Sequence, residues 1–390
     1  MVGSNQTKGE RIGKERKMEE RKKFSDLKRE VIDAGNCTLC GGCVATCRLL
    51  DLDYLRMDFS EGRPVLGEGQ QHPPTYGSCY APQGRPVKSG DQQCPIDCGY
   101  CYYQCPRVEE PELREGLEEF YEVVSKDEEI RGVCHNGGAL ISLLASALED
   151  AMVEGCITVA DSGDATPEVR VAMNKAALME NAGGSYGYSA ALTGIADAIL
   201  NYGLWSVALV GTPCQMAAYE KMLAVGRGTH NAHDFSSNVR LRISLLCQGA
   251  YSYDALLKDF IEGKRGIPAD TITNFEIQDD GLHVYAGDKE LLHAGLDEIA
   301  DYKREGCKIC EDFVGRFADI SVGHIGSPAG KSTVIVHTEV GKDAFESARQ
   351  WDFIEATPMD ERGVKLIQLL QEDKKKAGMA EKARRAKTAE

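Results

Sequence analysis

Four cysteines between residues 37 and 47 constrain this 390-residue chain more than any other feature. They are Cys37, Cys40, Cys43 and Cys47, separated by two, two and three residues. In this spacing, thiolates on a tight loop hold the irons of a 4Fe-4S cube, and the fourth thiolate commonly reaches a neighbouring cluster. Gly41 and Gly42 would let the backbone curl round such a cube. The sequence therefore predicts an iron–sulfur segment near the start of the chain.

A second group of four cysteines lies between residues 94 and 106. Its members are Cys94, Cys98, Cys101 and Cys105, and Pro106 follows the last of them. In the logic of two-cluster ferredoxins, one cube would be held by Cys37, Cys40, Cys43 and Cys105, and the other by Cys47, Cys94, Cys98 and Cys101. The three-residue interval after Cys94 is irregular, so Cys79 is an alternative ligand there.

The same stretch permits another interpretation. Cys94, Cys98 and Cys101, with Tyr100 before the last cysteine, match the signature of radical S-adenosylmethionine enzymes. The ferredoxin motif upstream and the cysteine–proline pair at 105–106 argue against it, and no repeating strand–helix pattern follows. We therefore favour two ferredoxin-like clusters, with the radical enzyme as a lesser alternative.

Four further cysteines are dispersed through the second half of the chain. They are Cys214, Cys247, Cys307 and Cys310. The first two lie at the ends of predicted strands, where site residues gather in α/β proteins. The last two form a Cys-x-x-Cys pair, which alone fits zinc or a redox dithiol. Together these cysteines would supply four ligands to one further metal site. Of the remaining cysteines, Cys134 and Cys156 are expected to be core thiols.

Composition changes divide the chain into four expected parts. They are a charged extension (1–30), a small bacterial-ferredoxin-like domain with two 4Fe-4S clusters (31–112), a mixed α/β domain (113–345) and a C-terminal helical tail (346–390). Apolar periodicity predicts helices over 140–151, 190–201 and 253–261, and strands over 156–160, 207–210, 240–247, 319–323 and 333–338. The stretch 61–93 is rich in Pro and Gly and is expected to be a long loop.

Charge and hydropathy exclude several classes of protein. The net charge is −16, but residues 1–30 carry +4 and 371–390 carry +3, which leaves −23 for the middle. Such an acidic body argues against nucleic acid as a partner. The longest apolar stretch, 138–148, has 11 residues, and a membrane span needs about 20. The charged N-terminus lacks the apolar core of a signal peptide. We therefore expect a cytoplasmic chain with reduced cysteines.

Two glycine-rich turns precede predicted helices. One is Asn136-Gly137-Gly138, and the other is the stretch 182–189. Free N–H groups at the start of a helix can hold a phosphate, although a plain helix cap explains such turns equally well. His230 and His233 are separated by two residues within a polar loop, where solvated side chains are a better explanation than a metal site.

Taken together, the stretch from about residue 128 to residue 341 resembles the beta subunit of coenzyme F420-reducing hydrogenase and the related F420H2 dehydrogenases. The resemblance rests on Asn136-Gly137-Gly138, 182–189, Gly211-Thr212-Pro213-Cys214-Gln215, 306–312, 318–323, 326–328 and 332–336. The two-cluster segment is similar to the extension of F420H2 dehydrogenase input subunits and to the amino-terminal half of F420-dependent sulfite reductases.

This resemblance implies a flavin- and F420-binding domain with one FAD and, beside it, a 4Fe-4S cluster on Cys214, Cys247, Cys307 and Cys310. The cofactor-binding residues that it implies are Asn136, Gly137, Gly138, Gly183, Ser185, Tyr186, Ser189, Gly211, Thr212, Pro213 and Lys331. The chain departs from the family pattern at Ile141, Ser185 and His337.

The implied function is hydride transfer between coenzyme F420 and FAD, with single electrons passing through three 4Fe-4S clusters. FAD handles both one and two electrons, so it belongs between a hydride carrier and the clusters. The expected partner is a hydrogenase, a heterodisulfide reductase or a membrane dehydrogenase complex, to which the chain would be peripheral. The F420 tail is polyanionic, and the basic candidates for it are Lys303, Arg304, Lys308, Arg316 and Lys331. Rivals are a reductase of chlorophyll derivatives and an electron-transfer flavoprotein without F420 activity.

Overall fold

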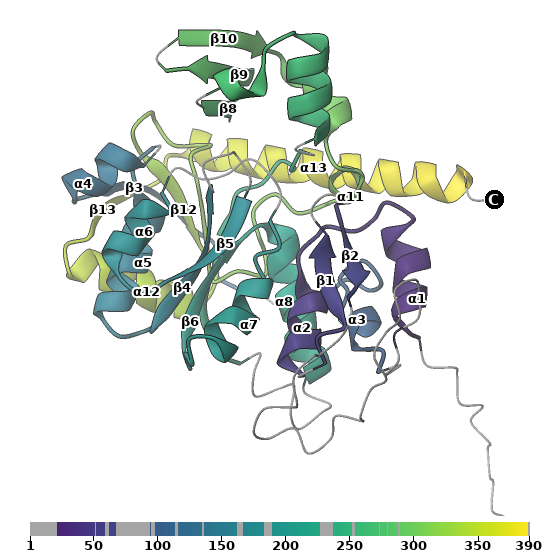
Figure 1. The fold of residues 1–390 in the computed structure, drawn as a ribbon. Helices are drawn as coiled ribbons and strands as arrows, with labels where there is room; N and C mark the ends of the chain where they lie inside the picture. Colours follow the sequence, from purple (N-terminus) through teal and green to yellow (C-terminus); the bar gives the residue numbers. More distant parts are fainter. Residues whose placement is uncertain are drawn as a thin grey trace, which may run out of the picture.

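A large mixed sheet forms the centre of the molecule (Figure 1). The computed structural model describes residues 22–50, 52–58, 62–67, 94, 98–113, 116–134, 136–161, 167–182, 189–226, 237–251, 254–272, 274–278, 280–287 and 289–388. The sheet has the strand order β13-β3-β12-β11-β7-β6-β4-β5. Its strands are β3 (Glu119–Ser125), β4 (Gly155–Asp161), β5 (Pro167–Ala172), β6 (Val207–Gly211), β7 (Val239–Leu245), β11 (Ile320–Gly323), β12 (Ser332–Val336) and β13 (Ile354–Pro358).

Four neighbouring strands, β4, β6, β7 and β11, run parallel, and the flanking strands are antiparallel. Every residue of β6 is buried, as expected for a strand covered on both faces. The strands predicted over 156–160, 207–210, 240–247, 319–323 and 333–338 correspond to β4, β6, β7, β11 and β12, with ends shifted by a few residues. The expected mixed α/β class is confirmed.

Helices cover both faces of this sheet (Figure 1). One face carries α4 (Glu128–Val133), α5 (Ala139–Glu149), α6 (Lys175–Glu180) and α12 (Glu339–Gln350). The other carries α7 (Thr193–Leu200) and α8 (Pro213–Gly226). Apolar side chains at helical spacing bury α5 against the sheet in the largest core cluster, which includes Leu143, Leu144 and Cys156.

The N-terminal segment packs on the second face. It contains α1 (Phe24–Leu27), the π-helical turn η1 (Lys28–Ile32), α2 (Gly42–Leu49), α3 (Tyr100–Tyr103) and a hairpin of β1 (Leu55–Asp58) with β2 (Arg63–Leu66). Ala45 and Leu49 of α2 join the core beneath α7 and α8. Strand β2 lies inside the stretch predicted to be a long loop; its Pro64 is buried, and its residues pair in register with those of β1. The rest of that stretch, with Cys79, lies outside the described residues.

A smaller unit protrudes from the body between Cys247 and Cys307, at the top of Figure 1. Its three-stranded sheet consists of β8 (Asn274–Gln278), β9 (Gly281–Ala286) and β10 (Lys289–Ala294). Helical segments η2 (Asp254–Lys264), η3 (Ala269–Thr271), α10 (Leu296–Ile299) and η4 (Ala300–Tyr302) accompany it, followed by α11 (Glu305–Lys308). The helix predicted over 253–261 lies in η2, which is wound as a π-helix. This unit has its own apolar core.

The C-terminal segment is part of the body rather than a separate tail. The expected boundary between residues 345 and 346 falls inside α12, and β13 pairs with β3 in the central sheet. The final helix, α13 (Glu361–Thr388), runs along the molecule to the N-terminal segment (Figure 1). Near its end, the Arg385 side chain donates to Asn36 at 2.9 Å and pairs with Glu305 at 2.7 Å. Thus α13 joins the first and last parts of the chain.

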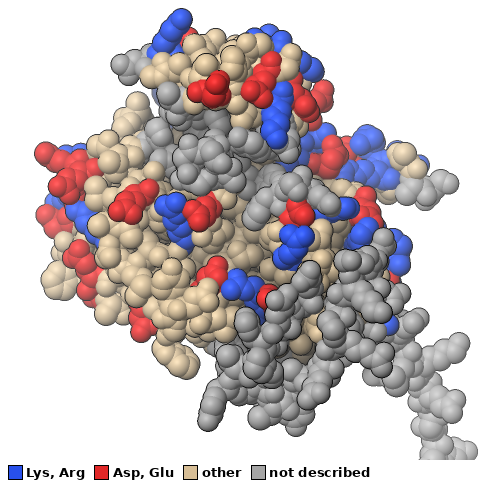
Figure 2. All heavy atoms as spheres, viewed as in Figure 1, with Lys and Arg blue, Asp and Glu red and all other residues tan. Residues whose placement is uncertain are grey.

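Acidic and basic side chains alternate over the face shown in Figure 2, so the negative net charge is not gathered in one patch there. Among the described residues, none of the helices is both long and apolar enough to traverse a bilayer.

Candidate functional site

The first set of thiols that the structure brings together contains Cys37, Cys40, Cys43 and Cys105. Burial raises the pKa of Cys43 well above its usual range, and the nearby thiolates of Cys40, Cys37, Cys101 and Cys105 raise it further. Burial likewise raises the pKa of Cys105 to about 12, with added repulsion from Cys40. Mutual repulsion of this kind requires short separations. Cys105 therefore lies close to Cys37, Cys40 and Cys43, although it follows them by some 60 positions in the sequence.

The second set contains Cys47, Cys94, Cys98 and Cys101. Burial raises the pKa of Cys47 to about 12, opposed by backbone N–H groups and reinforced by Cys94 and Cys98. The pKa of Cys101 is raised by burial and by Cys98, Cys47 and Cys94. The structure thus brings Cys94, Cys98 and Cys101 together with Cys47, in the crossed grouping that two-cluster spacing predicts, and the choice of Cys94 over Cys79 as a ligand stays a prediction.

A buried pair of side chains fixes the two groups against each other. The hydroxyl of Thr46 on α2 donates to the side-chain carbonyl of Gln104 at 2.6 Å, and the Gln104 amide donates to the carbonyl of Gly42 at 3.0 Å. Both side chains are buried, so each polar atom needs a partner of this kind. These two hydrogen bonds connect α2, which contains Cys43, to the turn that precedes Cys105.

The third set contains Cys214, Cys247, Cys307 and Cys310, and it lies where two parallel strands end. Cys214 opens α8 directly after β6, and its sulfur lies 3.2 Å from the Thr212 hydroxyl oxygen. Cys247 follows β7, and its N–H donates to Phe313 at 3.0 Å. Burial raises the pKa of Cys214, and the thiolates of Cys310, Cys307 and Cys247 add to the effect. The four dispersed cysteines therefore lie near one another, and their role as ligands of one cluster stays a prediction.

Two cations adjoin the third set, and sequence reasoning identified neither. Arg107 donates to the carbonyl of Gly306 at 3.0 Å, and Lys374 of α13 donates to the carbonyl of Cys247. Burial alone would raise the pKa of Cys310, but Lys374 and Arg107 outweigh it, and the pKa is lowered. Burial tends to lower the pKa of Lys374, yet the thiolates of Cys247, Cys310 and Cys307 raise it. The cation from α13 therefore stays charged beside sulfur.

The donor chemistry of all three sets fits 4Fe-4S clusters. Each set offers four thiols, and each contains a sulfur that accepts a backbone N–H: Leu39 to Cys37 at 3.4 Å, Tyr54 to Cys47 at 3.2 Å and Ala250 to Cys307 at 3.4 Å. Bonds from N–H groups to cluster sulfurs are one of the means by which proteins hold such clusters and set their potentials.

A cavity of about 300 Å³ adjoins the third set, at the carboxyl ends of the parallel strands. All four parallel strands contribute to its lining: Thr158 and Val159 of β4, Val210 and Gly211 of β6, Leu245 of β7, and Val322 and Gly323 of β11. Cys214, Cys247 and Cys307 also line it. Ligands of open α/β sheets bind at this edge, because the loops diverge there. A cofactor in the cavity would touch the third thiol set.

Five of the predicted cofactor-binding residues line this cavity: Asn136, Gly138, Ser189, Gly211 and Thr212. Three do not: Gly137 is packed against Val123 and Ser332, Pro213 faces a second cavity, and Lys331 pairs with Glu122 at 2.8 Å. Gly183, Ser185 and Tyr186 lie outside the described residues, as do His230 and His233. The lining also contains Thr38 and Asn181, which sequence reasoning did not single out, Ser332 of the resembling stretch 332–336, and Arg304, one of the basic candidates.

The turn before α5 has a backbone that favours glycine. Asn136 and Gly138 both have left-handed φ values, 56° and 72°. A Cβ on Gly137 would lie 2.4 Å from the carbonyl oxygen of Val123. The turn therefore packs directly on the sheet and presents the start of α5 to the cavity. The Ala139 N–H donates to the Ser332 hydroxyl oxygen at 3.3 Å, and the start of a helix in general favours an anion.

Gln215 joins the two glycine-containing loops at the cavity. Its side-chain oxygen accepts from the Thr212 N–H at 2.7 Å, and its amide donates to the Ser189 carbonyl at 2.8 Å. A Cβ on Gly211 would lie 2.6 Å from that same oxygen. Gly211 is therefore required for the close approach of Gln215.

Of the five basic candidates, one lines the cavity, and a second is its neighbour in the sequence. Arg304 lines it and also donates to the carbonyls of Thr38 and Cys37. Lys303 stacks its ammonium over the Tyr251 ring, 6.0 Å from the ring centre, next to Ala250. Lys308 pairs with Glu305, Arg316 with Asp312 and Lys331 with Glu122.

His337, one of the departures from the family pattern, does not reach the cavity lining. It is buried, and its Nε2 lies 2.8 Å from the Ser321 hydroxyl oxygen. Burial lowers its pKa to about 4, so the ring is neutral. Of the expected core thiols, Cys156 lies in the main core, whereas Cys134 also lines the cavity.

Comparison with known proteins identifies two adjoining family regions. The N-terminal region of the coenzyme F420 hydrogenase/dehydrogenase beta-subunit family matches residues 120–196, and the C-terminal region of the same family matches 204–362. The chain is 31% identical to coenzyme F420 hydrogenase subunit beta of Methanothermobacter thermautotrophicus, over 64% of this chain and 89% of that protein. It is 28% identical to an uncharacterised protein of Methanocaldococcus jannaschii, over 84% of this chain and 90% of that protein.

A solved structure is also similar. A chain of the F420-reducing [NiFe] hydrogenase complex from Methanosarcina barkeri, solved as a xenon derivative, aligns with a TM-score of 0.63 and 26% identity. The alignment covers 70% of this chain and 93% of that one. Helix α13 begins at Glu361, so nearly all of it lies beyond the matched family regions.

Proposed function

Because the chain belongs to the coenzyme F420 hydrogenase/dehydrogenase beta-subunit family, we propose that it transfers hydride between coenzyme F420 and FAD and exchanges single electrons with a partner through three 4Fe-4S clusters. When bound, the flavin would supply the conversion between two-electron and one-electron chemistry. The main support for the proposal is that three cysteines of the third thiol set, Cys214, Cys247 and Cys307, also line the cavity.

In this proposal the chain's own residues hold and orient the cofactor. The turn at Asn136 and Gly138 directs the N–H groups of α5 toward an anionic phosphate. Apolar side chains such as Ile141, Val210 and Leu245 exclude water from a ring system. Gln215 holds the Ser189 loop against β6 and so fixes the width of the cavity.

Arg304 and Lys303 are the cations that we propose for the anionic tail of coenzyme F420. Both precede Cys307 in the segment that closes one side of the cavity. The other three candidates are neutralised by the carboxylates with which they pair. A local positive potential of this kind lets an acidic protein bind a polyanion.

The clusters would be held close enough for electron transfer by direct contacts between the thiol sets. Gly306 packs on Cys37, where a Cβ would lie 2.5 Å from the carbonyl oxygen. Arg107, two residues after Cys105, donates to the same Gly306. The first and third sets are thus joined through one glycine, and the second set adjoins the first through Cys43 and Cys101.

We propose a hydrogenase, a heterodisulfide reductase or a membrane dehydrogenase complex as the redox partner, with this chain cytoplasmic or peripheral to the complex. The grouping of Cys94, Cys98 and Cys101 with Cys47 speaks against a radical enzyme, because such a cluster needs an iron without a protein ligand. An electron-transfer flavoprotein without F420 activity is the second candidate, since His337 departs from the family pattern and is turned into the core.

The test begins with anaerobic purification of the full chain. FAD, iron and the F420H2-dependent bleaching of a viologen dye are then measured. The proposal expects FAD, about twelve irons and bleaching. Lys303→Gln should raise the KM for F420H2 without lowering FAD content, whereas Lys365→Gln, on an exposed pair with Glu361, should change neither. FAD and a full iron content without bleaching would support the second candidate instead.

A further inference from the structure

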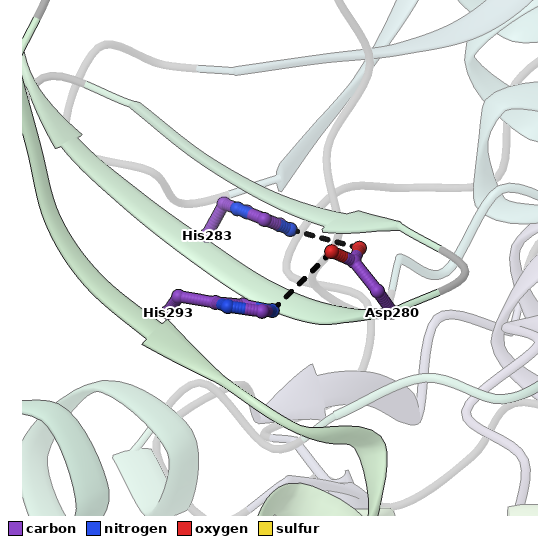
Figure 3. A group of neighbouring side chains, drawn as sticks. All are labelled: Asp280, His283 and His293. Atoms are coloured by element: carbon purple, nitrogen blue, oxygen red, sulfur yellow. Dashed lines mark hydrogen bonds and ion pairs between the residues drawn. The ribbon is translucent and has the colours of Figure 1, made fainter.

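Three metal-ligating side chains converge on the protruding unit, away from the cysteine sets. Asp280 lies in the turn between β8 and β9, His283 on β9 and His293 on β10. Figure 3 shows the three side chains pointing toward one another. Their ligand atoms all lie within 4.8 Å of one another. None of them takes part in the site described above.

A β-bulge brings the two histidines opposite each other. Tyr285 pairs with Glu290 in a regular register, which if continued would pair His283 with Leu292. The register shifts between Glu290 and Leu292, so that His283 pairs with His293 instead. Directly paired residues of an antiparallel ladder share a face of the sheet. The irregularity therefore aligns two imidazoles, and bulges are often found where a side chain must be re-aimed.

The rings lie almost parallel, with centres 4.4 Å apart and planes at 14°. The Nε2 atom of His283 lies 3.0 Å from one Asp280 carboxylate oxygen, and the Nε2 atom of His293 lies 3.4 Å from the other. Neighbouring ligand atoms around a tetrahedral zinc ion lie about 3.3 Å apart, given its bond lengths to nitrogen and oxygen. The two nitrogen–oxygen separations are close to this value, and all three ligand atoms lie within 4.8 Å of one another.

A fourth side chain orients the inner histidine. The Nδ1 atom of His283 lies 2.8 Å from a carboxylate oxygen of Glu290. Such a carboxylate behind a metal-binding imidazole fixes its tautomer and strengthens its other nitrogen as a ligand. The His283 side chain is only 12% exposed, whereas those of His293 and Asp280 are 48% and 61% exposed. The group thus has a supported inner ligand and an outer side open to a metal ion.

We propose that Asp280, His283 and His293 bind a divalent transition metal of the zinc class, with the remaining position left to water. Two imidazoles and one carboxylate suit a borderline cation and do not suit magnesium or calcium, which take oxygen ligands. The metal would join the β8–β9 turn to β9 and β10. It would stiffen the unit that connects Cys247 to Cys307, whose ends, Ala250 and Arg304, line the cavity.

The test is a zinc-binding measurement on the anaerobic protein with its cysteine sets loaded. Wild type and the double variant His283→Asn, His293→Asn are incubated with zinc chloride, passed over a chelating resin and analysed for zinc and iron. We expect wild type to retain about one zinc more than the double variant, with equal iron. Lys289→Gln, an exposed change on β10, should retain the wild-type amount.

A structural readout separates a metal site from a general loss of fold. Zinc should raise the melting temperature of wild type and of Lys289→Gln but not that of the double variant. X-ray absorption at the zinc edge should show nitrogen and oxygen neighbours with no sulfur. Equal zinc retention in wild type and the double variant, or sulfur neighbours in wild type, would overturn the proposal. The result is independent of F420 activity.

Discussion

The ammonium group of Lys374 donates a hydrogen bond to the carbonyl oxygen of Cys247. Because 126 residues separate the two positions, only the course of α13 brings them together. Gln371, one turn earlier, accepts from the N–H groups of Phe313 and Val314 and donates to the carbonyl of Glu311. One face of α13 therefore supports the loop that follows Cys310, and it supplies a half-buried cation.

We predict that Lys374→Met lowers the midpoint potential of the third cluster. A positive charge beside a cluster favours the reduced form, and its loss should shift the potential by about 50–100 mV at an effective dielectric constant near 20. EPR-monitored redox titration measures the shift. Lys376→Met, on the exposed side of the same helix, is the control and should leave the potential unchanged. An unshifted potential in Lys374→Met would refute the role of its charge.

Gly306→Ala should loosen the contact between the first and third thiol sets. The added Cβ would lie 2.5 Å from the Cys37 carbonyl oxygen, a separation that forces the backbone apart. We expect a loss of about 1–3 kcal/mol in stability and a weaker magnetic interaction between the reduced clusters. Melting curves and EPR line widths report the two effects. At Gly132 nothing lies within 4 Å of an added Cβ, so Gly132→Ala should show neither change.

Substitution of single cysteines tests the crossed grouping. Cys94→Ser should reduce the iron content from about twelve to about eight per chain, because one cube loses a ligand. Cys79→Ser should retain the full iron content, since Cys94 already adjoins Cys47 and Cys101. Iron analysis and EPR of the reduced proteins decide between the two cysteines. The opposite pattern would assign the ligand to Cys79.

His337 should make the folded protein less stable in acid. Its pKa is lowered to about 4 by burial, against about 6.5 in an unfolded chain. As the pH falls below 6.5 the unfolded chain binds a proton that the folded one does not, so stability is lost until the pH reaches about 4, by up to about 1.4 kcal/mol per pH unit.

The effect is isolated by comparison with a variant that cannot titrate. The melting temperatures of wild type and His337→Gln are measured between pH 8 and pH 5. Gln can still hydrogen-bond to the Ser321 hydroxyl, so the variant should be less sensitive to acid even if it is less stable at pH 8. Parallel pH profiles for the two proteins would contradict the assignment.

The thiol sets show how far sequence spacing can reach. Short intervals predict that Cys37, Cys40 and Cys43 lie on one loop, because a few residues can span only a few ångströms. The ferredoxin pattern also predicts that Cys105 joins the first three and that Cys47 joins the second group, and the structure groups them in this way. Apolar runs likewise predict the strands that precede Cys214 and Cys247.

The cavity shows where sequence reasoning stops. Asn136, Gly138 and Gly211 stand in turns with a glycine signature, so a local pattern could find them. Thr38 and Arg304 have no such signature, and they reach the cavity because Gly306 packs on Cys37. Lys331 matches the basic requirement of the site, yet it pairs with Glu122 on a neighbouring strand.

Spacing along the chain predicts the two ferredoxin-like cysteine groups, apolar periodicity predicts the mixed α/β class, and the resemblance of several motifs indicates the family. The folded arrangement was needed to show that Lys374 lies against Cys247, that Gly306 joins two thiol sets and that a bulge aligns His283 with His293. These contacts join residues through the packing of whole elements. A side chain that belongs to no local sequence motif can be assigned to a site only when the packing of these elements shows which residues it contacts.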